Sequence, residues 1–283
     1  MPKNRPLVEL KGLSYTYPGS DRPVFKDIHA TVCRGEFIAV IGPNGSGKST
    51  LARLISGLLQ PSGGEIIIDG LKAGDPTAGE TVRQRVGLVV QNPDNQLVAA
   101  VVEEDVAFGP ENLNLPPVQV RRRVDDALDA VGLQHLRRRP PHLLSGGEKQ
   151  RLAIAGLLAL KPSCLVLDEP TSMLDPLGRQ GVLQVLRSLA GAGKAVVMVT
   201  HHMDEAARAD RIWVLGNGVL AADDSPGTIF GREHRLLSSL GLGLPGMAEL
   251  ACCLANRGVA LPPDIVFIED LVDYLCRVLK QKN

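Results

Sequence analysis

The stretch that decides the fold is Phe37-Ile-Ala-Val-Ile41, followed directly by Gly42-Pro-Asn-Gly-Ser-Gly47-Lys48-Ser49-Thr50. It has the form G-x-x-x-x-G-K-[ST], and it lies after an apolar strand-like run and before a helix-forming one. Glycines let the backbone curl so that its N–H groups point at a phosphate, and a helix N-terminus adds a favourable dipole. The pattern therefore predicts a phosphate-binding loop between a buried strand and a helix.

The side chains of this loop suit a nucleotide with a magnesium ion. Lys48 has the reach for β- and γ-phosphates, and the Ser49 hydroxyl is a ligand for Mg²⁺. The residues expected to bind the nucleotide are Gly42, Pro43, Asn44, Gly45, Ser46, Gly47, Lys48, Ser49 and Thr50.

Apolar runs alternate with helical patterns on both sides of the loop. The strand-like runs are Phe37–Ile41, Glu65–Ile68, Val86–Val90, Cys164–Leu167, Ala195–Thr200 and Arg211–Leu215. Several of them are apolar throughout, which is typical of parallel strands buried on both faces. The helical stretches between them include Ser49–Leu59, Pro117–Val131 and Glu148–Leu160. The alternation predicts an α/β fold, a P-loop NTPase sheet covered by helices.

Two segments depart from this alternation. Residues 91–160 are rich in helix formers without a convincing strand, so we expect a helical subdomain there. Beyond Pro226, two stretches have apolar residues at helical spacing: Met247, Leu250, Ala251 and Leu254 in one, and Ile268, Leu271, Leu275 and Leu279 in the other. We therefore predict a nucleotide-binding domain over residues 1–226 and a small, mostly helical C-terminal domain over residues 227–283.

Composition excludes several classes of protein. Among 283 residues, Lys plus Arg and Asp plus Glu number 31 each, and aromatic residues are only 3%, so nucleic acid is a poor candidate ligand. Five cysteines without a Cys-x-x-Cys pair argue against disulfides and structural zinc. The N-terminal stretch is not apolar, and no apolar run approaches a membrane span. We expect a reduced, cytosolic protein that reaches a membrane through partners.

A second motif, Cys164-Leu-Val-Leu-Asp168-Glu169, ends an apolar strand with two acids. Ligands gather at the carboxyl ends of strands in open α/β sheets, which places both carboxylates near the phosphate loop. Asp168 suits the magnesium ion, and Glu169 suits the attacking water, either by holding it or by accepting its proton.

A third motif, Leu144-Ser145-Gly146-Gly147-Glu148, opens a long helix and predicts another anion site. One ATP does not easily reach two such sites far apart on one chain. Two subunits arranged head to tail solve this problem, because Ser145, Gly146 and Gly147 of each would close over the nucleotide of the other.

With these three motifs, the chain resembles the ABC ATPases over roughly Leu7 to Pro226. The resemblance implies that Tyr17 stacks on adenine, with Tyr15 as the competing choice. It also implies that Gln91, directly after a strand, contacts Mg²⁺ or water and senses a membrane partner.

The same resemblance implies that Asp175 communicates across the dimer and that His201 contacts the γ-phosphate, although His202 beside it leaves open which imidazole acts. Glu148 stands where the family often has glutamine. The implied catalytic residues are Lys48, Gln91, Glu169 and His201, and the implied magnesium contacts are Ser49, Gln91 and Asp168.

Three further stretches narrow the resemblance to energy-coupling factor transporter ATPases, and among these to the first of two ATPase paralogues. They are Gln91–Gln96, Val102–Gly109, and Arg257–Pro262 with Ile268–Tyr274. The resemblance implies a peripheral subunit on the cytoplasmic face of the cell membrane that binds ATP and Mg²⁺. Its partners would be a second ATPase subunit, identical or different, a transmembrane coupling subunit, and an interchangeable membrane subunit that binds a vitamin or a transition-metal ion. The alternatives are the ATPase of a conventional ABC importer or exporter, and a soluble ABC ATPase.

Overall fold

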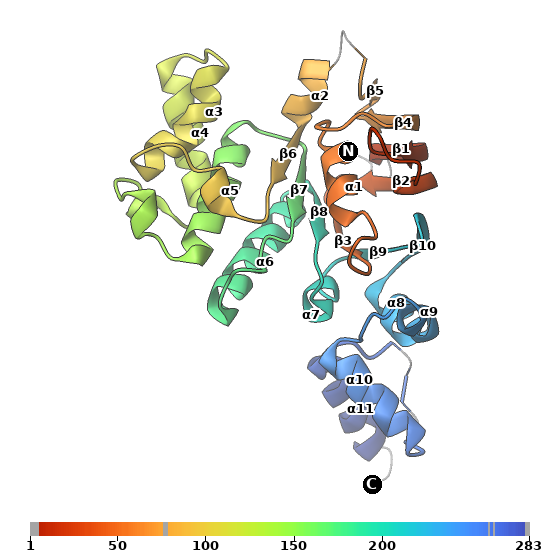
Figure 1. The fold of residues 1–283 in the computed structure, drawn as a ribbon. Helices are drawn as coiled ribbons and strands as arrows, with labels where there is room; N and C mark the ends of the chain where they lie inside the picture. The colour runs from red at the N-terminus through yellow and green to blue at the C-terminus, as the bar shows by residue number, and fades with distance from the viewer. Residues whose placement is uncertain (1–5, 76–78, 260, 263, 281–283) are drawn as a thin grey trace. The chain divides into compact units, whose positions relative to one another are not determined.

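A computed structural model describes the chain apart from residues 1–5, 76–78, 260, 263 and 281–283 (Figure 1). The described chain forms two compact units: residues 1–37 with 47–199, and residues 38–46 with 200–283. Within the described residues, no helix combines the length and the apolar character needed to cross a bilayer.

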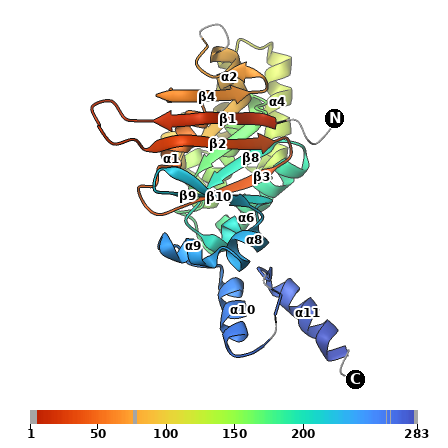
Figure 2. The same cartoon turned by 90° about the vertical axis from the view of Figure 1, so that its right-hand side faces the viewer.

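The first unit contains an antiparallel sheet of four strands in the order β2-β1-β4-β5. Its strands are β1 (Pro6–Tyr15), β2 (Phe25–Cys33), β4 (Gly63–Ile68) and β5 (Leu71–Lys72). Figure 2 shows β4, β1 and β2 side by side. The sequence analysis predicted neither β1 nor β2. In β1 a register shift between Leu10 and Leu13 breaks the two-residue alternation that marks a half-buried strand. In β2 the alternation is present, with Ile28, Ala30 and Val32 buried.

Three parallel strands in the order β8-β7-β6 form the other sheet segment of the first unit. They are β6 (Val86–Val89), β7 (Cys164–Asp168) and β8 (Ala195–Val199), and β7 is buried from Cys164 to Leu167. Helix α1 (Lys48–Ile55) contacts all three strands, and α6 (Pro176–Gly191) contacts β8. α2 (Gly79–Arg85) lies before β6 in the chain. Because the strands are parallel, their carboxyl ends meet at one edge, which is where functional side chains are expected.

The chain between β6 and β7, which is described throughout, is helical. It contains η1 (Pro93–Asn95), α3 (Val102–Asn112), α4 (Pro117–Ala130), η2 (Gln134–Leu136), η3 (Pro141–Leu143) and α5 (Gly146–Ala159). Helices α3, α4 and α5 contact one another around buried Val106, Val124, Leu128 and Leu152. We call α3 to α5 the helical block.

The second unit has strands in the order β10-β9-β3. β3 (Phe37–Ile41), all but its first residue in this unit, runs parallel to β9 (Arg211–Gly216), which pairs antiparallel with β10 (Val219–Asp224). Short helices α7 (Met203–Ala206), α8 (Pro226–Gly231) and α9 (His234–Ser239) follow β8 and β10 in the chain. Trp213 on β9 is fully buried, as are Ile38 to Ile41 on β3.

The last two helices, α10 (Gly246–Asn256) and α11 (Ile268–Lys280), share a small apolar cluster. Its buried members are Ala251, Ile265 and Leu271, with Met247 and Leu261 packed against them. The apolar face predicted for α11 is only partly covered, because Ile268 and Leu275 remain 57% and 40% exposed, and Val272 beside them is 50% exposed. An exposed apolar stripe of this kind is a candidate contact surface for a partner protein.

Candidate functional site

The phosphate loop joins β3 to α1, and its path depends on glycine at position 47. Gly47 has φ 93°, a left-handed conformation that side chains disfavour. A Cβ atom there would also lie 2.5 Å from Val24 Cγ1 and 2.6 Å from Phe25 Cζ. The residues at the start of β2 therefore hold the loop backbone close, and only glycine fits.

Lys48 begins α1 and is buried, with 7% of its surface exposed. Burial lowers the pKa of the Lys48 ammonium, and the carboxylates of Glu169 and Asp168 act in the opposite direction. The lysine is thus held in a partly desolvated position where a further anion would favour its charged form.

Ser49 and Asp168 lie together, although 119 positions separate them in the chain. The Ser49 hydroxyl donates to Asp168 Oδ1 at 3.0 Å, and Asp168 ends β7. Burial raises the pKa of Asp168, while the hydrogen bond from Ser49 lowers it. A hydroxyl and a desolvated carboxylate side by side are hard oxygen donors, and a nearby divalent cation would relieve the cost of burying the charge. The two residues therefore fit the magnesium ion expected from the sequence.

Glu169 has φ 49°, in the left-handed region that non-glycine residues rarely adopt. Its backbone N–H donates to Val199 O on the neighbouring strand at 3.0 Å. Left-handed residues of this kind concentrate at active sites, where the surrounding structure holds the strain. The turn directs Glu169 away from the line of β7.

Gln91 lies against Glu169. Gln91 Nε2 is 3.2 Å from Glu169 Oε2 and 3.2 Å from the Ser172 hydroxyl oxygen. Ser172 in turn donates to the Glu169 backbone carbonyl at 3.1 Å. The resemblance implied a contact from Gln91 to Mg²⁺ or water, which stays a prediction, and the structure adds a hydrogen bond from its amide to the candidate base. Sequence reasoning gave no role to Ser172, which lies three positions before Asp175.

Tyr15 and Tyr17, the two candidates for stacking on adenine, lie in different environments. Tyr15 is 5% exposed and belongs to the core, whereas Tyr17 is 39% exposed. The Tyr17 hydroxyl lies 2.9 Å from Thr50 Oγ1, which ties it to α1 directly after the phosphate loop. The rings meet edge to face with centroids 5.0 Å apart, so Tyr15 supports Tyr17 from beneath. Only Tyr17 offers a ring face to a ligand, which supports it over Tyr15.

Ser145 caps α5 through a capping box with Glu148. The Ser145 hydroxyl and backbone N–H both donate to Glu148 Oε2, at 2.9 Å and 2.8 Å, and the Glu148 N–H donates back to Ser145 Oγ at 3.3 Å. The hydrogen bond from the Ser145 N–H lowers the pKa of Glu148. Ser145 and Gly146 are exposed, so this helix start is open to an anion.

Gly147 and Asp175 fix how α5 meets α6. A Cβ on Gly147 would lie 2.9 Å from Gly178 Cα, so the two helix starts approach closely. Asp175 caps α6 by accepting the Gly178 N–H at 2.9 Å. Asp175, placed by the sequence at a subunit contact, is exposed and also carries this local role.

In the second unit, His201 is exposed and His202 is partly buried, with ring centroids 4.0 Å apart. Thr200 holds the turn: its hydroxyl donates to the buried Glu205 at 2.8 Å and accepts the His202 N–H at 3.0 Å. His201 is the more exposed of the two residues, which favours it over His202.

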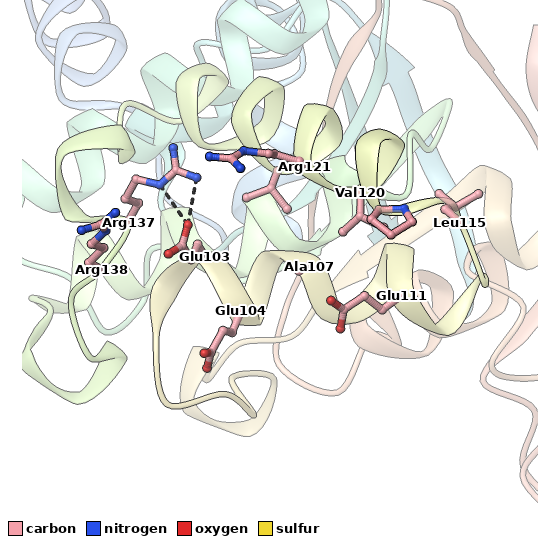
Figure 3. A pocket seen from close by; sticks show the side chains of 11 residues that line it. Glu103, Glu104, Ala107, Glu111, Leu115, Val120, Arg121, Arg137 and Arg138 are labelled. Atoms are coloured by element: carbon pink, nitrogen blue, oxygen red, sulfur yellow. Dashed lines mark hydrogen bonds and ion pairs between the residues drawn. The ribbon is translucent and has the colours of Figure 1, made fainter.

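A cavity of about 590 Å³ lies between α3 and α4 of the helical block (Figure 3). Glu103 on its wall is bound by Arg137 through two hydrogen bonds of 2.8 Å and 3.0 Å. Glu104 and Glu111 also line the cavity from α3, and both are exposed. Arg121 and Arg138 line the cavity as well and are also exposed, so its wall carries charges of both signs.

Comparison with known proteins gives a consistent result. A family model described as ABC transporter matches residues 25–172. The chain is 46% identical over 275 residues to the energy-coupling factor transporter ATP-binding protein EcfA1 of Caldanaerobacter subterraneus subsp. tengcongensis, covering 96% of this chain and 99% of that protein. Its identity to the protein of the same name from Symbiobacterium thermophilum is 48% over 281 residues, covering 96% and 98%.

Solved structures agree. The structure of cbiO1 from Clostridium perfringens, part of the ABC transporter complex cbiONQ, matches with a TM-score of 0.76 and 35% identity, over 87% of this chain and 98% of that one. The ATP-binding cassette MJ0796, as a dimer in a post-hydrolysis state with ADP and Pi, matches with a TM-score of 0.68 and 31% identity, over 77% and 98%.

We predict that Gly47→Ala lowers the thermal unfolding midpoint and abolishes nucleotide binding, because the new methyl group collides with Val24 and Phe25. Gly45→Ala is the matched control: Gly45 also has positive φ, at 79°, but no atom lies within 4 Å of its Cβ position. Differential scanning fluorimetry, with and without nucleotide, measures both effects. Equal losses in the two variants would contradict the close approach at Gly47.

Proposed function

We propose a working cycle for this chain, which belongs to the ABC transporter family and, within it, to the energy-coupling factor ATP-binding proteins. It is an ATP-hydrolysing transporter subunit. The observation that carries the proposal is the meeting of four side chains at the edge of β7: Ser49 on Asp168, and Gln91 on Glu169. In the proposed cycle, two ATPase subunits close on ATP and drive a membrane coupling subunit that imports a vitamin or a transition-metal ion.

Nucleotide binding is assigned to the phosphate loop and its neighbours. The backbone N–H groups of the loop and the N-terminus of α1 hold the phosphates, and Lys48 neutralises the β- and γ-phosphate charge. Tyr17 stacks on adenine, an assignment supported by its exposure and its bond to Thr50. Ser49 and Asp168 hold Mg²⁺, which when bound neutralises phosphate charge during transfer.

Hydrolysis is assigned to Glu169 and Gln91. The Glu169 carboxylate orients a water molecule in line with the bond to the leaving ADP and accepts its proton as the oxygen attacks the γ-phosphorus. Gln91 Nε2 donates to the same carboxylate and so fixes its orientation. His201, which is exposed, is assigned a contact with the γ-phosphate.

A second ATPase subunit completes each site in this proposal. Ser145, Gly146 and Gly147 of one subunit donate to the γ-phosphate held by the other. The assignment is supported by the exposure of Ser145 and Gly146 and by the dipole at the start of α5, which favours an anion. Asp175 lies at the start of α6, which contacts α5, and is assigned to the subunit interface. ATP thus joins the two subunits, and hydrolysis releases them.

The coupling subunit is proposed to bind the helical block at the cavity between α3 and α4. Glu103 is neutralised by Arg137. The other charged side chains on the wall are the exposed carboxylates of Glu104 and Glu111 and the exposed guanidinium groups of Arg121 and Arg138, which suits a partner segment that carries charges of both signs. The chain would then be peripheral on the cytoplasmic face of the membrane, with the substrate chosen by an interchangeable membrane subunit.

Residues 227–283 are proposed as a separate domain that contributes to the ATPase dimer. The proposal is supported by the exposed apolar side chains of Ile268, Val272 and Leu275 on α11, which water disfavours and a partner would cover.

We predict that Glu169→Gln lowers ATP turnover by roughly 10²–10⁴-fold, the usual range for the loss of a general base, while ATP still binds. Lys48→Ala should instead lose nucleotide binding. Steady-state phosphate release and titration with a fluorescent nucleotide separate the two effects. Near-normal turnover in the Glu169→Gln protein would contradict the role of Glu169 as the general base. A wild-type binding curve for Lys48→Ala would contradict the role of Lys48 in binding the phosphates.

The transport assignment is tested by purifying the tagged chain from its own cells in gentle detergent and identifying the proteins that accompany it. We expect a second ATPase, a coupling membrane protein and several small membrane proteins. Recovery of one fixed permease pair would instead indicate a conventional ABC transporter.

The docking cavity is tested in the same preparation. Glu104→Lys should reduce recovery of the coupling protein, because it reverses a charge on the cavity wall. Asp126→Lys, the same change on the exposed side of α4, should leave recovery unchanged. Equal recovery from both variants would move the docking surface elsewhere.

We predict that Val272→Asp weakens the ATP-bound dimer, because a carboxylate would enter the apolar stripe of α11. The dimer is first trapped with ATP in a Glu169→Gln background and measured by light scattering. Asp273→Asn, on the exposed side of the same helix, should leave the dimer intact. An unchanged dimer in both variants would exclude α11 from the interface.

A further inference from the structure

The run Gln91–Gln96, which marks the subfamily, is held as a rigid turn on β6. The Asn92 side chain accepts the Asp94 N–H at 3.0 Å and caps η1, which starts with the buried Pro93. Gln96 fixes the far end, because its amide accepts the Val90 N–H at 3.0 Å and donates to Leu88 O at 3.0 Å. Since both ends are bonded, a displacement of the turn displaces Gln91 with it.

One side chain of this turn reaches α5, which we call the signature helix because it begins with the motif Ser145-Gly146-Gly147. Asp94 Oδ1 lies 2.8 Å from the Lys149 ammonium on α5, two residues beyond Gly147 and within the first turn and a half of that helix. The Lys149 side chain is 20% exposed and that of Asp94 is 60% exposed. Ion pairs with an exposed partner add little to stability, and this one joins two segments that lie 55 positions apart in the chain.

The Asp94–Lys149 contact connects two functional segments, the start of α5 and the turn that follows β6. At one end, Ser145 and Glu148 form the cap of the helix that carries Lys149. At the other end, Gln91 donates to the carboxylate of Glu169. We propose that the Asp94–Lys149 ion pair is a positioning link, which ties the signature helix serving the partner's nucleotide to the glutamine that orients the chain's own base.

The inference rests on the proposed roles of Glu169 and Ser145, and it adds a residue pair that contacts neither nucleotide. A shift of α5 on closing over the partner's ATP would be passed through Lys149 and Asp94 to Gln91. Each hydrolytic site would then sense whether the other is occupied, which is energetic coupling between two sites through a physical contact.

The test is a charge-swap cycle in the full-length chain. Asp94→Asn and Lys149→Met should each lower kcat roughly two- to thirtyfold, the range expected for residues that carry coupling. The affinity for a fluorescent ATP analogue should stay within about twofold of wild type, because neither side chain belongs to the phosphate loop. The Hill coefficient for ATP in hydrolysis should fall toward one.

The double variant Asp94→Lys with Lys149→Asp should recover most of the lost kcat and the Hill coefficient, since it restores the pair with reversed charges. Arg122→Met is the matched control, because it removes a cation from an exposed ion pair with Asp126 in the same helical block. It should behave as wild type. Thermal midpoints are recorded for every variant, and Asp94→Glu with Lys149→Arg, which keep the charges, should retain activity.

Wild-type kcat and Hill coefficient in both single variants would overturn the link. Losses that simply add in the charge-swapped protein, or that follow a fall in the thermal midpoint, would make the pair only structural and would overturn it as well. Failure of the proposed function is distinguishable, because it would appear as full turnover in Glu169→Gln regardless of residues 94 and 149.

Discussion

Lys48 starts α1 almost completely buried, and two carboxylates that follow a fully apolar strand act on its charge. This arrangement constrains the site around it. The lysine must be desolvated to hold phosphate strongly, so its charge requires Asp168 and Glu169 nearby. Both acids lie at the end of a buried strand, and burial raises the pKa of Asp168 while the hydrogen bond from Ser49 lowers it. The loop, the strand end and Ser49 are thus connected through the charges of these three side chains.

Much of this was predictable from the sequence, because the residues involved lie in contiguous patterns. The apolar runs Phe37–Ile41 and Cys164–Leu167 are strands with nearly the predicted bounds, and the family assignment is confirmed by relatives over nearly the whole chain. The roles of the individual site residues stay predictions. β1 escaped prediction because its register shift breaks the alternation, and α1 ends at Ile55, four residues early, before a left-handed Gly57.

Contacts between segments that lie far apart in the chain could not be predicted from the sequence. The choice of Tyr17 over Tyr15 depends on exposure, which two tyrosines one residue apart do not reveal. The hydrogen bond from the Gln91 amide to Glu169 was not predicted, because it depends on the neighbouring parallel strands β6 and β7, which bring both side chains to one edge. No sequence motif indicated that Ser172 would contact Gln91 and Glu169. Such pairings follow from strand order and turn geometry, and pattern reading within one segment does not contain them.

The left-handed backbone of Glu169 limits which residues natural selection can try there. A β-branched side chain would clash with its own carbonyl at φ 49°, and asparagine, aspartate and glycine are the types that settle there most readily. Of these, only aspartate keeps a carboxylate, and it is one methylene too short to occupy the place of Glu169 Oε2 beside Gln91. The backbone therefore admits few alternatives, and those it admits would impair the chemistry, so this position has little room for neutral drift.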